Sequence, residues 1–298
     1  MIRATMVVLF LARAANGYAQ EAKPSPPPLY SLPWQLRPVA AATCLRSDTN
    51  VATFDKDPDS GATVASTLLF SYRVTPHFAP LIRLGAVTNW PLKGDAQGSI
   101  VNPVIGALYG LQFKQVLRLG IFVGAALPFG QGGGNTPNAA IQAATKAGVY
   151  ARAAMDNAMF AVNYFTLFPG VGFAYVDHGL TVQAEVTLLE LIRVRGEAVD
   201  KDSSRTNMTM GLHVGYFVTR QLSLGAEVRY QVWLSTPQMV TADSSARGQV
   251  SVGMGLRGHF KLPGTAWFRP GLAYTRGLDN PMARTDYNIV QVDLPVLF

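Results

Sequence analysis

The sequence predicts an all-β protein: a transmembrane, antiparallel, up-and-down β-barrel of about 12 strands with one helical extracellular insert. Three observations lead to this fold class. Apolar and polar side chains alternate with a period of two along many segments, which sends successive side chains to opposite faces of a sheet. Mean hydropathy is +0.17, yet no run of about 18 apolar residues is present, so membrane-crossing helices are not predicted. Short and long connections also alternate along the chain.

The first 19 residues have the pattern of a secretory signal peptide. Arg3 supplies the basic region, Ala4 to Ala12 the apolar core, and Gly17-Tyr18-Ala19 a small-x-small cleavage site. Residues 20–33 are rich in proline, which predicts an extended periplasmic lead-in. The barrel is then expected to occupy residues 34–298.

The strands are predicted from segments of ten or so residues, near the length that crosses a bilayer at a tilt. In 221–234, for example, Leu222, Leu224 and Val228 share one face, and Glu227 and Arg229 the other. Similar alternation marks 208–218, 249–260 and 290–298. Weaker alternation marks 34–46, 62–74, 79–90, 100–113, 117–128, 164–176, 180–195 and 266–277. Ten or fourteen strands remain open, because Pro38 and Pro80 interrupt two of these segments.

The connections support the same fold. Brief turns are predicted at 75–78, 114–116, 177–179, 219–220 and 262–265, and long polar links at 47–61, 91–99, 129–163, 196–206, 235–247 and 278–286. Short periplasmic turns and long outer loops are the rule in membrane β-barrels. An even number of strands returns both termini to the periplasmic side.

Taken together, the signal peptide, the alternating segments and a final strand that ends in Phe298 resemble Gram-negative outer-membrane β-barrel proteins of a porin-like kind, with no subfamily identified. The resemblance implies location in the outer membrane, with its lipid and lipopolysaccharide as surroundings. It also implies recognition by the barrel-assembly machinery, through Phe298 and the apolar residues at alternate positions before it.

Parity along the strands predicts which charged side chains face the lumen: Arg37, Arg73, Arg83, Arg118, Glu185, Glu227, Arg229, Arg257, Arg269 and Asp293. Two interpretations remain open. A ring of guanidiniums would attract anions and hold carboxylates or phosphates. Alternatively, arginine–carboxylate pairs could fill a narrow lumen and brace its wall, as the spacing of Glu227 and Arg229 suggests.

The long insert 129–163 is a candidate constriction loop. Gly132, Gly133 and Gly134 provide a flexible hinge, Thr136 is a candidate helix cap with Pro137 at the first helical position, and residues 138–158 favour a helix. The helix could fold into the pore mouth or stand outside the barrel as a cap.

Other classes of function find little support. The basic residues are scattered singly although the pI is about 9.6, so no nucleic-acid partner is predicted. The single cysteine, Cys44, permits no intramolecular disulfide. No catalytic constellation, bound metal or other cofactor is expected. Asp55, Asp57 and Asp59 could ligate Ca²⁺ through their oxygen atoms, but an acidic, solvated loop is the favoured interpretation.

The predicted function is therefore a narrow channel for passive passage of small polar or anionic solutes. The alternative is a non-conducting structural or surface-interaction barrel with a plugged lumen, and an outer-membrane lipid hydrolase is the least favoured possibility.

Overall fold

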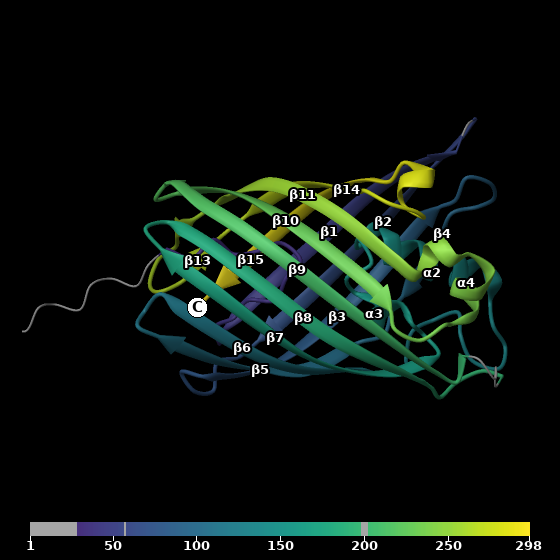
Figure 1. Cartoon of the computed structure of the whole chain (residues 1–298), viewed down its shortest axis with the longest axis horizontal. Coiled ribbons are helices and arrows are strands. Elements are labelled where there is room, and N and C mark those ends of the chain that lie inside the picture. Colours follow the sequence, from purple (N-terminus) through teal and green to yellow (C-terminus); the bar gives the residue numbers. More distant parts are fainter. Residues whose placement is uncertain (1–28, 57, 198–201) are drawn as a thin grey trace, which may run out of the picture.

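The computed structural model describes residues 29–56, 58–197 and 202–298. The predicted signal peptide and residues 20–28 of the lead-in lie outside these ranges. The described residues form one antiparallel sheet that closes on itself when the first strand pairs with the last, from Cys44 opposite Leu297 to Thr53 opposite Asn288. The predicted fold class is confirmed: an all-β barrel with twelve strands in its wall (Figure 1).

The twelve wall strands follow one another around the barrel in chain order. They are β1 (Cys44–Lys56), β2 (Asp59–Ser71), β3 (Phe78–Trp90), β5 (Val104–Phe113), β6 (Leu117–Ala126), β7 (Tyr164–Asp177), β8 (Leu180–Arg193), β9 (Ser204–Thr219), β10 (Leu222–Trp233), β11 (Gly248–Gly258), β14 (Gly271–Gly277) and β15 (Asn288–Leu297).

Short helices, turns and strands lie at both ends of the wall. They are β4 (Gln97–Ile100), which pairs with β3, the hairpin β12 (Phe260–Lys261) and β13 (Trp267–Phe268), the helices α2 (Ala139–Ala151), α3 (Asn157–Phe160) and α4 (Gln238–Ala242), and the 3₁₀ turns η2 (Ser244–Arg247) and η3 (Ala283–Thr285). In the part of the chain that the structure describes, no helix is long and apolar enough to cross a membrane.

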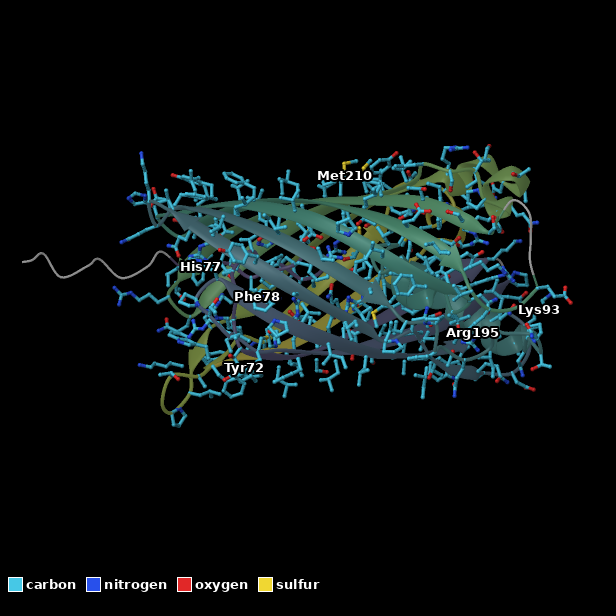
Figure 2. The ribbon with its side chains drawn as sticks, turned by 90° about the horizontal axis from the view of Figure 1, so that it is seen from below. Tyr72, His77, Phe78, Lys93, Arg195 and Met210 are labelled. Atoms are coloured by element: carbon cyan, nitrogen blue, oxygen red, sulfur yellow. The ribbon has the colours of Figure 1, made fainter. Side chains whose placement is uncertain are left out.

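The two faces of the wall have the reverse of the usual polarity of a soluble protein. On β10, the polar side chains of Ser223, Glu227 and Arg229 are buried inside, whereas Leu224 and Val228 are exposed outside. The same inversion holds around the barrel, and Figure 2 shows the side chains that project from its outer surface. An exposed apolar surface of this extent requires a cover. Lipid provides one, and outward apolar rows are the signature of membrane barrels.

This surface yields a depth-dependent prediction. Val228 lies midway along β10 and is 46% exposed, while Val218 lies one residue from the end of β9. Val228→Arg should lower the free energy of unfolding by about 2–4 kcal/mol, and Val218→Arg by about 0–1 kcal/mol, because the cost of a charge on the lipid face falls toward the interface. Urea unfolding in lipid vesicles measures both. Equal losses would contradict a membrane-spanning position for β10.

The predicted first strand, 34–46, is wrong, and so is the predicted loop 47–61. The first strand begins at Cys44, and β1 pairs with β2 as far as Lys56 opposite Asp59. The outward face of β1 carries Ser47, Thr49 and Thr53 as well as Leu45 and Val51, so polar residues interrupt its lipid-facing apolar row. Residues 29–43, which we call the lumen segment, instead run inside the barrel, including the part of the predicted lead-in that the structure describes.

Candidate functional site

The lumen segment is held by carboxylates of the barrel wall. Glu227 accepts hydrogen bonds from the backbone N–H groups of Trp34 (2.6 Å) and Gln35 (3.2 Å). Glu185 accepts one from the backbone N–H of Arg37 (2.6 Å) and pairs with the guanidinium of the same residue. These carboxylates satisfy backbone donors that would otherwise be buried without partners. The inner wall therefore binds this segment as it would bind a peptide.

Guanidiniums bind the carbonyl groups of the same segment. Arg257 Nε donates to Leu32 O at 3.0 Å, and Arg46 Nη2 donates to Pro33 O at 3.1 Å. Both arginines also share the buried carboxylate of Asp293, at 2.5 Å from Arg257 Nη2 and 2.7 Å from Arg46 Nε. One carboxylate thus links β1, β11 and β15 to the lumen segment.

Glycines in the wall make room for this segment. A Cβ at Gly211 would lie 2.6 Å from Leu36 Cδ1, and one at Gly120 would lie 2.9 Å from Val39 Cα. Real Cβ atoms do not approach other atoms this closely. At these two positions, glycine on the inner face of the wall therefore leaves room for the lumen segment.

The insert between β6 and β7 enters the opposite end of the lumen. Its helix α2 starts after Asn138, whose Oδ1 accepts a hydrogen bond from Ile141 N at 3.0 Å. Thr136 is therefore not the cap, and Pro137 precedes the helix, because the helix begins two residues later than predicted. Of the two placements left open by the sequence, the structure has the insert inside the barrel mouth.

A buried ion-pair network fixes the insert to the wall. The Arg152 side chain is 1% exposed and bonds to Asp48 Oδ2 (2.7 Å), Asn50 Oδ1 (2.9 Å) and Asp156 Oδ2 (2.8 Å). Asp156 in turn receives two hydrogen bonds from Arg83, at 2.6 and 2.9 Å. Burial alone would raise the pKa of Asp156, but the guanidiniums of Arg83 and Arg152 lower this pKa well below its usual range.

The chain leaves α2 through a strained turn. Ala153 (φ 50°) and Ala154 (φ 57°) are consecutive non-glycine residues in the left-handed region. Such conformations cost roughly 1–3 kcal/mol each and persist where the surroundings over-determine them. The contacts of the neighbouring Arg152 provide that constraint. The turn leads directly into α3.

Residues 154–160, which we call the septum, divide the lumen. On one side lies an inner cavity of about 440 Å³, which reaches the end of the barrel with short turns and is lined by Met155, Asp156 and Met159 of the septum. On the other side lies an outer cavity of about 700 Å³ beneath the long loops, lined by Asn157 and Phe160 of the septum.

Most of the charged residues assigned to the lumen by parity line its interior in the structure: Arg37, Arg83, Arg118, Glu185, Glu227, Arg229, Arg257, Arg269 and Asp293. Arg229 pairs with Glu227 at 2.6 Å, and Arg118 lies 4.8 Å from the ring centre of Tyr30. Arg73 is the exception. It lies beyond Ser71, where β2 ends, and is exposed, because parity loses its meaning past the strand.

Two sets of lumen residues escaped the sequence analysis. Asp48 and Asn50 fell in a predicted loop and Arg46 at the end of the predicted strand 34–46, although their spacing of two marks one face of a strand. Arg152 and Asp156 lie in the insert, and no sequence pattern indicates their partners. The glycine run 132–134 lies at the rim, where Gly134 N donates to Asn163 Oδ1 at 2.8 Å, and does not form the septum.

One serine–histidine pair lies at the inner cavity. Ser223 Oγ and His259 Nε2 are 2.9 Å apart. The charged groups that act most on this imidazole are Arg269 and Arg257. A catalytic histidine needs a carboxylate to stabilise its protonated form, and two cations oppose that form.

Within the described ranges, no three His, Cys, Asp or Glu side chains are grouped as metal ligands.

Comparison with known proteins supports the fold. No family model and no curated protein matches the chain. Among solved structures, the COG4313 outer membrane channel from Pseudomonas putida F1 aligns with 12% identity and a TM-score of 0.53, covering 91% of this chain and 100% of that one. The NanC porin aligns with 8% identity and a TM-score of 0.49, covering 85% and 98%. The chain therefore shares a closed β-barrel fold with the COG4313 channel.

Proposed function

We propose that the protein is an outer-membrane channel for the passive passage of small polar or anionic solutes. The observation that carries this proposal is the pair of cavities that approach each other from opposite ends of the barrel and are divided by the septum. A displacement of this short segment would join them. The apolar outer surface and the fold shared with the COG4313 outer membrane channel support the location.

The orientation follows from the loops. Both termini of the barrel lie at one end, since Cys44 pairs with Leu297. We assign this end to the periplasm, because its turns are short and short periplasmic turns are the rule for such barrels. In this orientation the last strand presents Phe298 to the periplasm, where the barrel-assembly machinery would read it, and the long loops face lipopolysaccharide.

The charge at the periplasmic mouth favours anions. Arg118, Arg220 and Arg269 line this end of the inner cavity. A low-dielectric passage with several guanidiniums raises the local concentration of anions. We therefore expect the channel to prefer anions to cations of similar size.

A second candidate is a non-conducting barrel. The lumen segment and the ion pairs of Glu185, Glu227 and Asp293 occupy much of the interior. In that case the polar interior is a brace for the wall, and function resides in the loops at the outer surface.

Planar-bilayer recording separates the two candidates. The channel proposal predicts discrete conductance steps with a reversal potential that indicates anion preference. The double variant Arg220→Glu and Arg269→Glu should move this potential toward cation preference, because it replaces two cations at the mouth with anions. Arg73→Glu, a matched change at an exposed turn, should leave it unchanged. A stably inserted barrel that gives no steps would establish the second candidate.

A further inference from the structure

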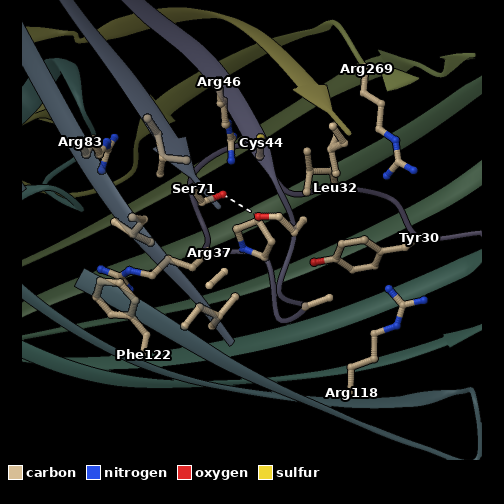
Figure 3. A pocket seen from close by; sticks show the side chains of 18 of the residues that line it. Tyr30, Leu32, Arg37, Cys44, Arg46, Ser71, Arg83, Arg118, Phe122 and Arg269 are labelled. Carbon is tan, nitrogen blue, oxygen red and sulfur yellow. Dashed lines mark hydrogen bonds between the residues drawn. The ribbon is translucent and has the colours of Figure 1, made fainter. Parts of the chain in front are cut away.

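The inner cavity has two chemically different ends. Its mouth carries Arg118, Arg220 and Arg269 beside Tyr30. Toward the septum the wall is apolar and is formed by Val104, Leu108, Phe122, Phe168, Leu189 and Met159. Figure 3 shows Arg118 and Arg269 extending toward Tyr30 from opposite sides of the cavity, with Phe122 at a distance from both.

The deeper arginines that border this cavity form ion pairs with carboxylates. Arg37 pairs with Glu185, Arg46 with Asp293, and Arg83 with Asp156, the last at 2.6 Å. Their charges are therefore used to hold the lumen segment and the septum. Because Asp293 is shared by Arg46 and Arg257, its single negative charge offsets these two guanidiniums only in part.

Two arginines at the mouth, Arg220 and Arg269, have different surroundings. Among the described residues, no carboxylate forms an ion pair with Arg220 or Arg269, and Arg269 Nε is buried without a hydrogen-bond partner. A buried donor left without a partner costs about 1–3 kcal/mol, and more when the group is charged. An anion that reached Arg269 would remove this cost and meet the positive field of its neighbours.

We propose that the inner cavity binds an amphipathic organic anion, with its carboxylate at the arginines of the mouth and its apolar body against the wall near the septum. A volume of about 440 Å³ accommodates a chain of eight or so carbons. This inference deepens the proposed function, on which it rests for its physiological meaning, by naming the solute class as medium-chain or aromatic monocarboxylates.

Binding of radiolabelled octanoate to the full-length protein in lipid nanodiscs tests the proposal, with equilibrium dialysis against empty nanodiscs to subtract partition into lipid. Octanamide and octylammonium have the same chain length without the negative charge, and acetate has the charge without the chain. Octanoate should bind at least tenfold more tightly than each of them, because a charge-assisted hydrogen bond and apolar burial are both needed.

Three variants refine the test. Arg269→Gln should weaken octanoate binding about tenfold through the lost charge, and Arg73→Gln should have no effect. Ala79→Phe should also weaken binding about tenfold, because Ala79 lines the cavity with its side chain buried and a phenyl ring would fill it. Heat-modifiable migration in SDS gels confirms that each variant is a folded barrel.

Equal binding of octanoate and octanamide would overturn the proposal, as would full affinity in Arg269→Gln or an absence of octanoate binding at millimolar concentration. These outcomes are independent of conductance. A protein that conducts but does not bind octanoate refutes this site and leaves the channel intact. A silent barrel that binds octanoate refutes the channel and leaves the site intact.

Discussion

Replacement of Arg152 by alanine is expected to free the septum and to raise channel conductance or open probability severalfold. The guanidinium is the centre of a network that joins the insert to β1 through Asp48 and Asn50 and to its own chain through Asp156. Removal of one partner from a buried ion pair costs roughly 3–5 kcal/mol, because the remaining charges lose their compensation. Here that cost would destabilise the insert in its position inside the barrel mouth.

Planar-bilayer recording measures this effect, with Arg284→Ala as the matched control. Arg284 pairs with Asp243 at 3.1 Å in an exposed position, where an ion pair is worth about 0–1 kcal/mol. The double variant Arg152→Met and Asp48→Asn should restore part of the closed behaviour, because it removes both charges of one pair. If Arg152→Ala and the parent protein give the same traces, the septum is not the barrier.

Replacement of Glu227 by alanine is expected to release the lumen segment. Its carboxylate is fully buried, accepts the N–H groups of Trp34 and Gln35, and neutralises Arg229. Without it, two backbone donors lose their partner and the Arg229 guanidinium loses its carboxylate, which we expect to weaken docking of the segment by about 3–5 kcal/mol.

A cysteine at position 31 reports on this release. Ser31 is buried in the lumen, so in a Cys44→Ser background the new thiol of Ser31→Cys should react slowly with a water-soluble maleimide. Glu227→Ala should accelerate the reaction at least tenfold. Glu190→Ala is the control, since Glu190 bonds to Ser204 and Thr206 and not to the segment. Equal rates in the two variants would show that Glu227 does not hold the segment.

The sequence predicts the wall far better than the contents of the barrel. Strands β9, β10 and β11 are predicted correctly, because contact with lipid requires an apolar side chain at every second position. Strand β1 is missed because Ser47 and Thr53 break that row. The lumen segment misleads for the opposite reason: Leu32, Trp34 and Leu36 alternate as in a strand, yet all three are buried inside the barrel.

For the candidate site, too, the sequence predicts residues of the wall but not the residues that bind them. Parity places Arg83 and Arg257 in the lumen, because the direction of a side chain depends only on its own strand. Their partners depend on the closed fold: Asp156 comes from the insert, and Asp293 from the last strand. Pairs so distant in sequence leave no local pattern from which they could be predicted.

The seam between β1 and β15 has a consequence for folding kinetics. It joins segments from opposite ends of the barrel sequence, so its formation closes the longest loop in the wall and carries the largest loss of chain entropy. Asp293 bonds to Arg46 across this seam. Arg46 donates to Pro33 O of the lumen segment, and Asp293 also binds Arg257, which donates to Leu32 O. We therefore expect closure of the seam to be the last and slowest step of folding. The lumen segment should become buried only when the seam closes.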